Sequence, residues 1–204
     1  MSTRVFVIRH GETEWSRTRR FAGSRDIPLA EAGRRQCEAV ADALASTHVA
    51  AIYASPLERA RTAAETIAKP HRLPVTVEPD LREMAFGAWE GLTREEVAAR
   101  DPERYAIWQS APHELVLPGA ERVGDVAARV AAVVEELRAI HADETIVVVA
   151  HAVVVRLIVL GALGLGPERL WSVDASPAGI TEIEYQPAWV TVHRMNTLAH
   201  LAVG

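Results

Sequence analysis

The chain has 204 residues, of which 49% are apolar and 24% charged, and its formal net charge is −5. This length and composition predict one domain over residues 1–204 with a sizeable core, and the negative charge disfavours nucleic acid as a partner. The single cysteine, Cys37, excludes an internal disulfide and fits a reducing compartment, so we expect a cytoplasmic protein.

One apolar stretch, residues 146–166, is long enough to be considered as a membrane span. It contains His151 and Arg156 near its middle, and an arginine there costs about 3 kcal/mol of insertion free energy. Its first part is typical of a buried strand and its second part of a buried helix, so we expect no membrane-spanning segment. The amino-terminal residues also lack the apolar region and the cleavage site of a signal peptide.

The first predicted strand covers residues 5–8, where four large apolar residues in a row fit a strand buried on both faces. The strand ends at Arg9, His10 and Gly11. Ligands of open α/β sheets bind at the carboxyl ends of strands, and a glycine there permits a close backbone approach. The same residues also fit a strand that simply ends in a polar loop.

A turn-rich segment without periodicity follows at residues 21–28. We expect this segment to form a loop on the same sheet edge as His10. Its candidate substrate contacts are Gly23, Ser24 and Arg25.

Helical spacing of apolar residues predicts the next helix over residues 31–46, and a short buried strand is expected over 51–54. Residues 55–58, Ser-Pro-Leu-Glu, have the form of a capping box with proline at the first helical position. This pattern predicts a helix start that places Arg59 on the opening turn, where a helix favours anions. Taken alone, Arg59 also fits a solvated helix arginine.

A third strand is predicted at residues 75–77, followed by an irregular stretch that contains Glu83. A second capping box at 93–96 predicts short helices after it. Because no strand is expected within 86–122, we interpret this part as a cap beside the sheet edge. A peripheral helical hairpin is the alternative. The aromatic residues expected to give the cap its apolar surface are Phe86, Trp89, Tyr105 and Trp108.

The clearest amphipathic helix covers residues 123–140. A strand over 145–150 follows, ends in His151 and leads into a helix that begins near Ala152. His151 therefore repeats the predicted geometry of His10, at the end of a buried strand.

Two further strands, over residues 180–185 and 190–194, are joined by a turn that contains Pro187, which favours a hairpin or an edge position. Strands that alternate with helices predict an α/β sandwich with a mostly parallel sheet. Parallel strands would gather the following polar side chains at one edge: Arg9, His10, Ser55, Arg59, Glu83 and His151.

Two imidazoles, two guanidiniums and one carboxyl group suit phosphoryl transfer. Arginines bind tetrahedral oxyanions, and a neutral imidazole can attack phosphorus without a metal. Neighbouring guanidiniums lower the pKa of such an imidazole and keep it neutral, while a carboxylic acid can protonate the leaving alkoxide. The sequence contains no P-loop motif and no zinc-ligand spacing, so we expect neither a metal nor another cofactor.

Four motifs resemble those of the histidine phosphatase superfamily, the phosphoglycerate mutase-like proteins. They are R-H-G-E-T at 9–13, S-P-L-x-R at 55–59, L-R-E with F-G-x-W-E-G at 81–91, and the apolar strand that ends in His151. The resemblance implies a three-layer α/β/α sandwich with a small helical cap. Its six-stranded mixed sheet would be mostly parallel, with one antiparallel strand.

The same resemblance implies a role for each residue of the site. His10 would be the phosphorylated nucleophile, and Glu83 would be the proton donor. Arg9, Arg59 and His151 would form the phosphate pocket.

Three positions depart from the pattern of this family. Ser16 stands where asparagine is frequent, and Ala152 stands where glycine is frequent. The Ser16 hydroxyl and the Ala152 backbone N–H are still candidate substrate contacts. Arg122 places a cation where the family usually has a small hydroxyl, so Arg122 and Arg25 are candidate extra cations for the substrate.

The resemblance is strongest to the small phosphatases of the family, which include α-ribazole phosphatase and broad-specificity members. We therefore expect a metal-independent phosphatase that acts on a small phosphorylated metabolite through a phosphohistidine. The alternatives are a cofactor-dependent phosphoglycerate mutase-type phosphotransferase and a non-catalytic phospholigand-binding module. The expected partner is a small phosphomonoester, with no nucleic acid and no membrane, and a homodimer is left open.

Overall fold

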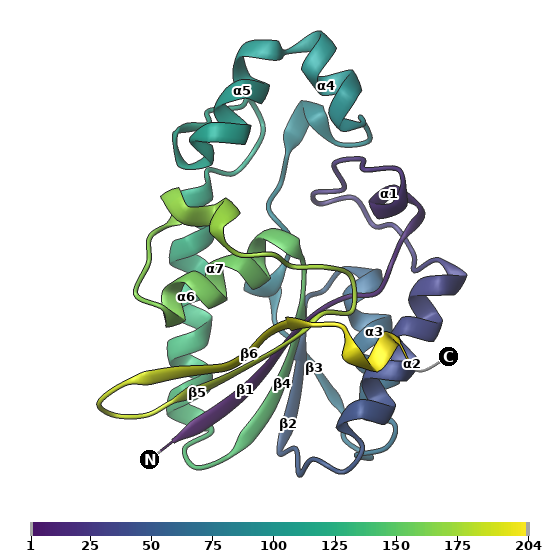
Figure 1. Cartoon of the computed structure of the whole chain (residues 1–204), viewed down its shortest axis with the longest axis vertical. Helices are drawn as coiled ribbons and strands as arrows, with labels where there is room; N and C mark the ends of the chain where they lie inside the picture. Colours follow the sequence, from purple (N-terminus) through teal and green to yellow (C-terminus); the bar gives the residue numbers. More distant parts are fainter. Residues whose placement is uncertain (1, 203–204) are drawn as a thin grey trace.

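Residues 2–202 are described by a computed structural model, and six strands in this part of the chain form one sheet (Figure 1). The strand order is β3-β2-β4-β1-β5-β6, and β5 alone runs against the other five. The strands are β1 (Thr3–Arg9), β2 (Ala51–Ala54), β3 (Val75–Val77), β4 (Thr145–Ala150), β5 (Ile180–Tyr185) and β6 (Val190–Thr197). The predicted α/β fold with a mixed six-stranded sheet is confirmed.

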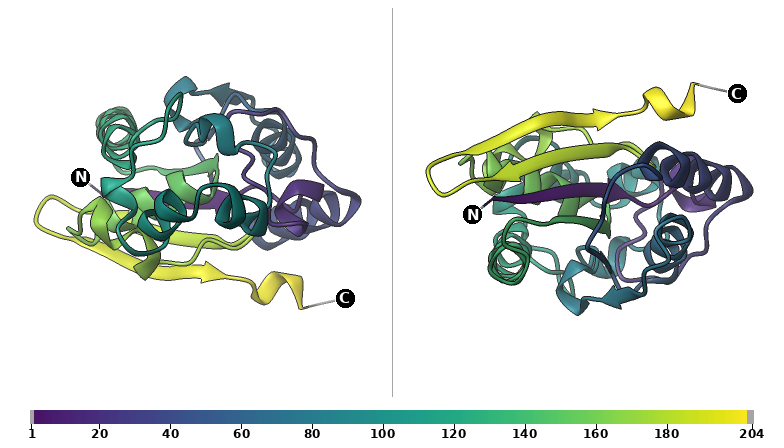
Figure 2. Two further views of the ribbon diagram at one scale, coloured as in Figure 1. Left: turned by 90° about the horizontal axis from the view of Figure 1, so that it is seen from above. Right: turned by 90° about the horizontal axis from the view of Figure 1, so that it is seen from below.

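Helices cover both faces of the sheet (Figure 2). The pair α2 (Glu31–Leu44) and α3 (Glu58–Ala68) packs on one face, and the pair α6 (Val123–Ile140) and α7 (Ala152–Ala162) packs on the other. Alternate residues of β1 belong to the two resulting cores, because successive side chains of a strand point to opposite faces. Both faces of β1 are therefore buried, which accounts for the uninterrupted apolar run in its sequence.

The segment 86–122 lies above the carboxyl ends of the strands (Figure 1). It contains the short helices α4 (Arg94–Arg100) and α5 (Pro102–Ser110), as expected. The predicted capping box at the start of α4 is confirmed, since Thr93 and Glu96 each accept the other's backbone N–H. The remaining short elements are α1 (Glu14–Arg17) and the 3₁₀ turns Pro79–Leu81, Gly87–Trp89, Pro112–Glu114, Pro167–Ser172 and Ala199–Leu201.

The capping box predicted at residues 55–58 is wrong. Helix α3 begins at Glu58, and its N-cap residue, Leu57, contributes no side-chain bond. Asp26 from the preceding loop instead accepts the Glu58 backbone N–H at 2.7 Å, so Ser55 is not needed as a cap. Arg59 nevertheless lies on the opening turn of α3, as predicted.

The apolar stretch at residues 146–166 is divided between β4 and α7. Within residues 2–202, no helix combines the length and the hydropathy that a bilayer crossing requires.

The loop after β1 packs tightly against the first turn of α2. A Cβ atom at Gly11 would clash with the backbone of Gly33, and a Cβ atom at Gly33 would clash with the carbonyl oxygen of Glu12. Glycine at both positions lets the two backbones touch, which fixes the position of His10.

Candidate active site

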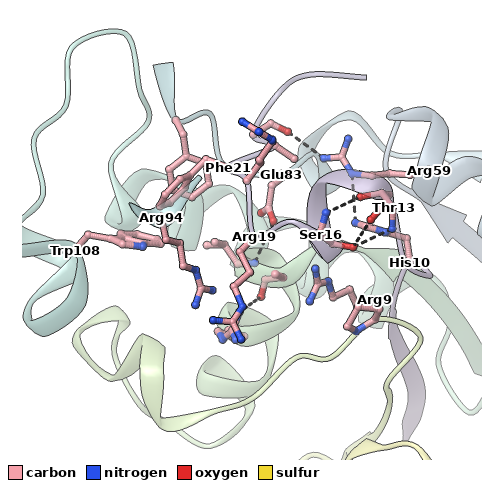
Figure 3. A pocket seen from close by; sticks show the side chains of 18 of the residues that line it. Arg9, His10, Thr13, Ser16, Arg19, Phe21, Arg59, Glu83, Arg94 and Trp108 are labelled. Carbon is pink, nitrogen blue, oxygen red and sulfur yellow. Dashed lines mark hydrogen bonds between the residues drawn. The ribbon is translucent and has the colours of Figure 1, made fainter. Parts of the chain in front are cut away.

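A pocket with a volume of about 220 Å³ opens at the carboxyl edge of the sheet, beneath the segment 86–122 (Figure 3). Four of the five residues expected to be catalytic, namely Arg9, His10, Arg59 and Glu83, line this pocket. His151 lies next to His10 rather than on the pocket wall, with ring centroids 5.1 Å apart. The ends of β1 and β4 and the start of α3 thus bring together side chains from distant parts of the sequence.

His10 is buried and takes part in two hydrogen bonds that define its tautomer. Its Nδ1 lies 2.7 Å from the Gly11 carbonyl oxygen, which can only accept, so Nδ1 carries the proton. Its Nε2 accepts the Nε–H of Arg59 at 3.2 Å. Burial, and then the charges of Arg59 and Arg9, hold the pKa of His10 well below the ordinary histidine value of 6.5. His10 is therefore neutral at neutral pH, with a lone pair on Nε2.

The two guanidiniums beside His10 are fixed by backbone carbonyl groups. Arg59, which is only 1% exposed, donates to the carbonyl oxygens of Gly23 at 3.0 Å and Arg25 at 2.7 Å. Arg9 donates to the Ala175 carbonyl oxygen at 2.7 Å, while its buried Nε has no acceptor among the described residues. Burial lowers the pKa of Arg9 to about 10, so the side chain stays cationic at neutral pH. These two fixed cations form a site for a tetrahedral oxyanion.

His151 is fully buried, and its Nε2 lies 2.6 Å from the hydroxyl oxygen of Ser55. That oxygen also accepts the Leu57 backbone N–H at 3.3 Å. The hydroxyl can donate its own proton to Nε2 of His151. Burial, and then the charge of Arg59, hold the pKa of His151 well below 6.5. A neutral ring that accepts at Nε2 must carry its proton on Nδ1, which is buried and has no partner among the described residues. In that tautomer, the Nδ1–H is available to an oxygen atom of a ligand bound beside His10.

Glu83 is 7% exposed, and two backbone N–H groups fix its carboxyl group. Oε1 accepts from Met84 at 3.0 Å, and Oε2 accepts from Val153, at the start of α7, at 3.3 Å. Because Glu83 shares the pocket with His10, its carboxyl group can exchange a proton with a leaving group or a water molecule bound there.

Three of the six residues predicted as substrate contacts, Ser16, Gly23 and Ala152, line the pocket. The Ser16 hydroxyl donates to the Thr13 carbonyl oxygen at 2.9 Å and accepts the Thr13 N–H at 2.9 Å. Its proton is therefore already engaged by the Thr13 carbonyl oxygen, while its oxygen forms part of the capping box at the start of α1.

The other three predicted contacts are not among the lining residues. Ser24 bonds to the Glu90 carboxylate through its N–H and its hydroxyl, and the guanidinium of Arg25 lies 3.5 Å from the same carboxylate. Arg122 is exposed at the N-cap of α6. Their side chains are thus directed to Glu90 or to solvent.

The pocket has a second group of lining residues that the sequence analysis did not assign to it. Its cations come from the turn after α1 and from α4 and α7, and its aromatic rings come from four segments. Its members are Arg19, Arg20, Arg94, Arg156, Phe21, Phe86, Trp108 and Trp171. Of the four aromatic residues expected to give the cap its apolar surface, Phe86 and Trp108 line the pocket, whereas Trp89 and Tyr105 are not among its lining residues. The position of Arg156 within the apolar stretch 146–166 was a sign that this arginine has a function. No sequence pattern indicated that Trp171 would line the pocket.

Among residues 2–202, no group of three or more His, Cys, Asp or Glu side chains is arranged to hold a metal ion. The positive charge around His10 comes from arginines. The site can therefore bind an oxyanion, present it to a neutral imidazole and supply a carboxyl group for proton transfer.

Residues 5–198 match the family model of the histidine phosphatase superfamily, branch 1. The chain is 32% identical over 198 residues to phosphoserine phosphatase 1 of Hydrogenobacter thermophilus. This alignment covers 97% of this chain and 94% of the relative. Its structure is similar to that of Bacillus stearothermophilus YhfR, with a TM-score of 0.92, 31% identity and coverage of 98% and 99% of the two chains. It is also similar to the α-ribazole phosphatase of Shigella flexneri, with a TM-score of 0.87, 25% identity and coverage of 95% and 96%. The chain therefore belongs to branch 1 of the histidine phosphatase superfamily.

Proposed function

We propose that this protein hydrolyses phosphomonoesters of small metabolites through a phosphohistidine at His10, without a metal. The observation that carries the proposal is the environment of His10, a buried neutral imidazole whose Nε2 faces the guanidinium of Arg59. A nucleophile for phosphorus needs this lone pair, and the phosphoryl oxygens need the adjacent cations.

In the first step, Arg9 and Arg59 hold the phosphoryl group, and Nε2 of His10 attacks phosphorus. The P–N bond forms while the bond from phosphorus to the alcohol oxygen breaks, and Glu83 gives its proton to that oxygen. In the second step, water attacks phosphorus and loses a proton to the Glu83 carboxylate. The P–N bond breaks, which releases inorganic phosphate and restores neutral His10 and protonated Glu83.

Hydrolysis is favoured over a mutase reaction by the functions of the two similar phosphatases described above. The Hydrogenobacter relative is named a phosphoserine phosphatase, and the Shigella structure is an α-ribazole phosphatase. Both proteins are phosphatases, which hydrolyse the phosphate ester of their substrate, but their substrates differ. We therefore propose the reaction class for this chain and leave the choice of metabolite to the substrate-binding side of the pocket.

The test is turnover of p-nitrophenyl phosphate by the purified chain, with and without EDTA. We expect activity that EDTA does not change, and no activity from a His10→Ala variant whose circular dichroism matches wild type. Loss of activity in EDTA that a divalent ion restores would contradict the metal-free mechanism. Binding of phosphate without any turnover would favour a phospholigand-binding module instead.

A cytoplasmic location is part of the proposal, and it is supported by the lone buried thiol of Cys37, which is unpaired within the described residues. A homodimer stays a prediction, which sedimentation of the purified chain would test.

A further inference from the structure

Glu83 lies in a segment that has little regular structure. Between the 3₁₀ turns Pro79–Leu81 and Gly87–Trp89, residues 82–85 belong to no helix or strand. Such a segment has no ladder of backbone hydrogen bonds to hold it, yet a proton donor must stay within hydrogen-bond reach of the leaving oxygen. The position of the Glu83 carboxyl group in the pocket therefore depends on tertiary contacts (Figure 3).

One guanidinium, that of Arg129 on α6, holds the backbone around Glu83. Its Nη1 donates to the carbonyl oxygens of Asp80 and Arg82, and its Nη2 donates to that of Glu83 at 3.5 Å. The two remaining N–H groups bind both oxygens of the Glu121 carboxylate, at 3.0 and 3.1 Å. All five N–H groups of Arg129 thus have acceptors, and three of these acceptors belong to the segment that carries Glu83.

Glu121, two residues before the start of α6, holds the same segment on the other side of Glu83. Its backbone N–H donates to the Ala85 carbonyl oxygen at 3.0 Å, and its carboxylate accepts the Ala85 N–H at 3.0 Å. Burial alone would raise the pKa of Glu121, but the hydrogen bonds from Arg129 and Ala85 outweigh burial and lower it. Glu121 is therefore an ionised partner for Arg129 at neutral pH.

The two residues are supported by a rigid element. Helix α6 packs on the sheet through buried valines on either side of Arg129, since Val126 is 0% and Val130 is 1% exposed. The Arg129 side chain itself is only 10% exposed, so water and salt screen its bonds little. Side chains fixed in this way hold a functional group more precisely than a loop does alone.

We propose that Arg129 and Glu121 are positioning residues that hold the Glu83 carboxyl group where it can protonate the leaving oxygen. This inference rests on the proposed function, because it takes Glu83 to be the acid of the first step. Neither residue lines the pocket, so each acts through the backbone of residues 80–85. A displacement of about 1 Å at a reacting group can slow a reaction by roughly 10²-fold, so bonds outside the pocket can control its chemistry.

The main variant is Arg129→Lys, with Arg138→Lys as the matched control. Lysine keeps the positive charge, which adds to burial and to nearer charges in lowering the pKa of His151, but it has fewer N–H groups and no planar fork. Any effect of Arg129→Lys therefore reports geometry and not charge. Arg138 lies on the same helix, pairs with Glu135 at 2.6 Å and does not line the pocket.

Glu121→Gln is the second variant, which keeps the shape of the side chain and replaces one acceptor oxygen by an amide group. It breaks the paired bonds with Arg129 from the other partner. The two variants disturb the same contact in different ways, so a folding defect in one of them does not remove the test.

The experiment compares single-turnover rates for two leaving groups. The esters are p-nitrophenyl phosphate and an alkyl phosphate, which is glycerol 3-phosphate or phosphoserine, whichever wild type hydrolyses faster. We expect Arg129→Lys and Glu121→Gln to slow the alkyl ester by roughly tenfold or more and the nitrophenyl ester by less than about threefold, because nitrophenolate leaves with little help from an acid. Arg138→Lys should keep the wild-type rates on both esters.

A Glu83→Gln background separates positioning from general stability. There Arg129→Lys should slow the alkyl ester no further, because the acid that Arg129 positions has been removed. An equal loss on both esters, or an undiminished effect of Arg129→Lys in the Glu83→Gln background, would overturn the positioning role and leave the proposed function intact.

Hydrogen exchange of the Met84 amide measures the position of Glu83 without turnover, because this N–H donates to Oε1 of Glu83 at 3.0 Å. We expect exchange at Met84 to be at least about tenfold faster in Arg129→Lys than in Arg138→Lys. If wild type hydrolysed neither kind of ester, the proposed function would fail on its own. Equal exchange at Met84 in the two lysine variants would show that Arg129 does not hold the Glu83 carboxyl group.

Discussion

His10 and His151 are both kept neutral by their surroundings in the folded protein. Burial is the largest cause that lowers each pKa well below 6.5, and the charge of Arg59 comes next for both. In the unfolded chain both imidazoles take up a proton as the pH falls through 6.5, whereas in the folded protein they do not. Acid therefore favours the unfolded state.

We expect the free energy of unfolding to fall as the pH drops below 6.5, by up to about 1.4 kcal/mol per pH unit for each of the two histidines. A His10→Gln variant should lose one of these two contributions and show a correspondingly shallower slope. Urea unfolding in phosphate-free buffer, repeated at several pH values below and above 6.5, measures the slope. Equal slopes in wild type and His10→Gln would mean that His10 is not held neutral.

The hydrogen bond with Ser55 couples the tautomer of His151 to the direction of the hydroxyl. With the hydroxyl, 2.6 Å from Nε2, as the donor, Nδ1 is the protonated atom. We expect ¹⁵N chemical shifts in histidine-labelled protein to show His151 as the Nδ1–H tautomer near neutral pH. In Ser55→Ala this preference should weaken, and kcat should fall about tenfold or more because the phosphoryl group loses an oriented donor. An Nε2–H tautomer in wild type would show that the hydroxyl accepts instead of donating.

Glu83 is expected to act as the acid of the first step, and the leaving group reveals this role. An alkoxide needs a proton to leave, whereas nitrophenolate leaves with little help. Since general acid catalysis contributes roughly 10²- to 10⁴-fold, Glu83→Gln should slow an alkyl phosphate by about that factor and p-nitrophenyl phosphate far less. Single-turnover rates for both esters provide the comparison. A uniform loss would assign Glu83 to the orientation of Arg9 or Arg59 and leave the proton donor unidentified.

At the scale of elements, the site depends on the contact between the loop after β1 and the first turn of α2. Gly11 and Gly33 allow this contact, and there is no space for a Cβ atom at either position. Gly33 lies within α2, where alanine has the higher helix propensity. In a Gly33→Ala variant, the clash would therefore lower the free energy of unfolding, and the higher helix propensity would raise it.

We expect the clash to prevail at Gly33, so that Gly33→Ala lowers the free energy of unfolding by about 2 kcal/mol and reduces kcat by displacing His10. Gly124 in α6 is the matched control, because a Cβ atom there would meet nothing within 4 Å. Gly124→Ala should stabilise the protein by about 0.5–1 kcal/mol and leave kcat unchanged. Urea unfolding and p-nitrophenyl phosphate turnover measure both effects. A stabilised and fully active Gly33→Ala would refute the proposed contact.

Most elements were predictable from the sequence for identifiable reasons. The apolar runs of β1 and β4 reflect burial on both faces, and the spacing in α6 reflects a single buried face. The start of α3 was not predictable in detail. Ser55 has the residue type of an N-cap, but its hydroxyl serves His151, and Asp26, 32 positions from Glu58 in the chain, satisfies the helix instead.

At the scale of the whole molecule, the parallel sheet explains which part of the site could be foreseen. Residues that directly follow β1 and β4 must meet at one edge, so His10 and His151 follow from topology once the strands are recognised. Substrate contacts depend instead on the path of loops and of the segment 86–122. Arg25 and Arg122 have the same side chain as Arg94, yet only Arg94 lines the pocket. The residue type alone does not predict whether a side chain points into the pocket.

The central claim is that His10 becomes phosphorylated during turnover. The most direct measurement is rapid acid-free quenching of wild type with excess substrate, followed by intact-protein mass spectrometry and mapping of the modified peptide. We predict one added phosphoryl group on His10 that is stable to base and lost in acid, and no such species in His10→Ala. Steady turnover with no phosphoryl group on His10 at any time point, or with the group on another residue, would contradict the claim.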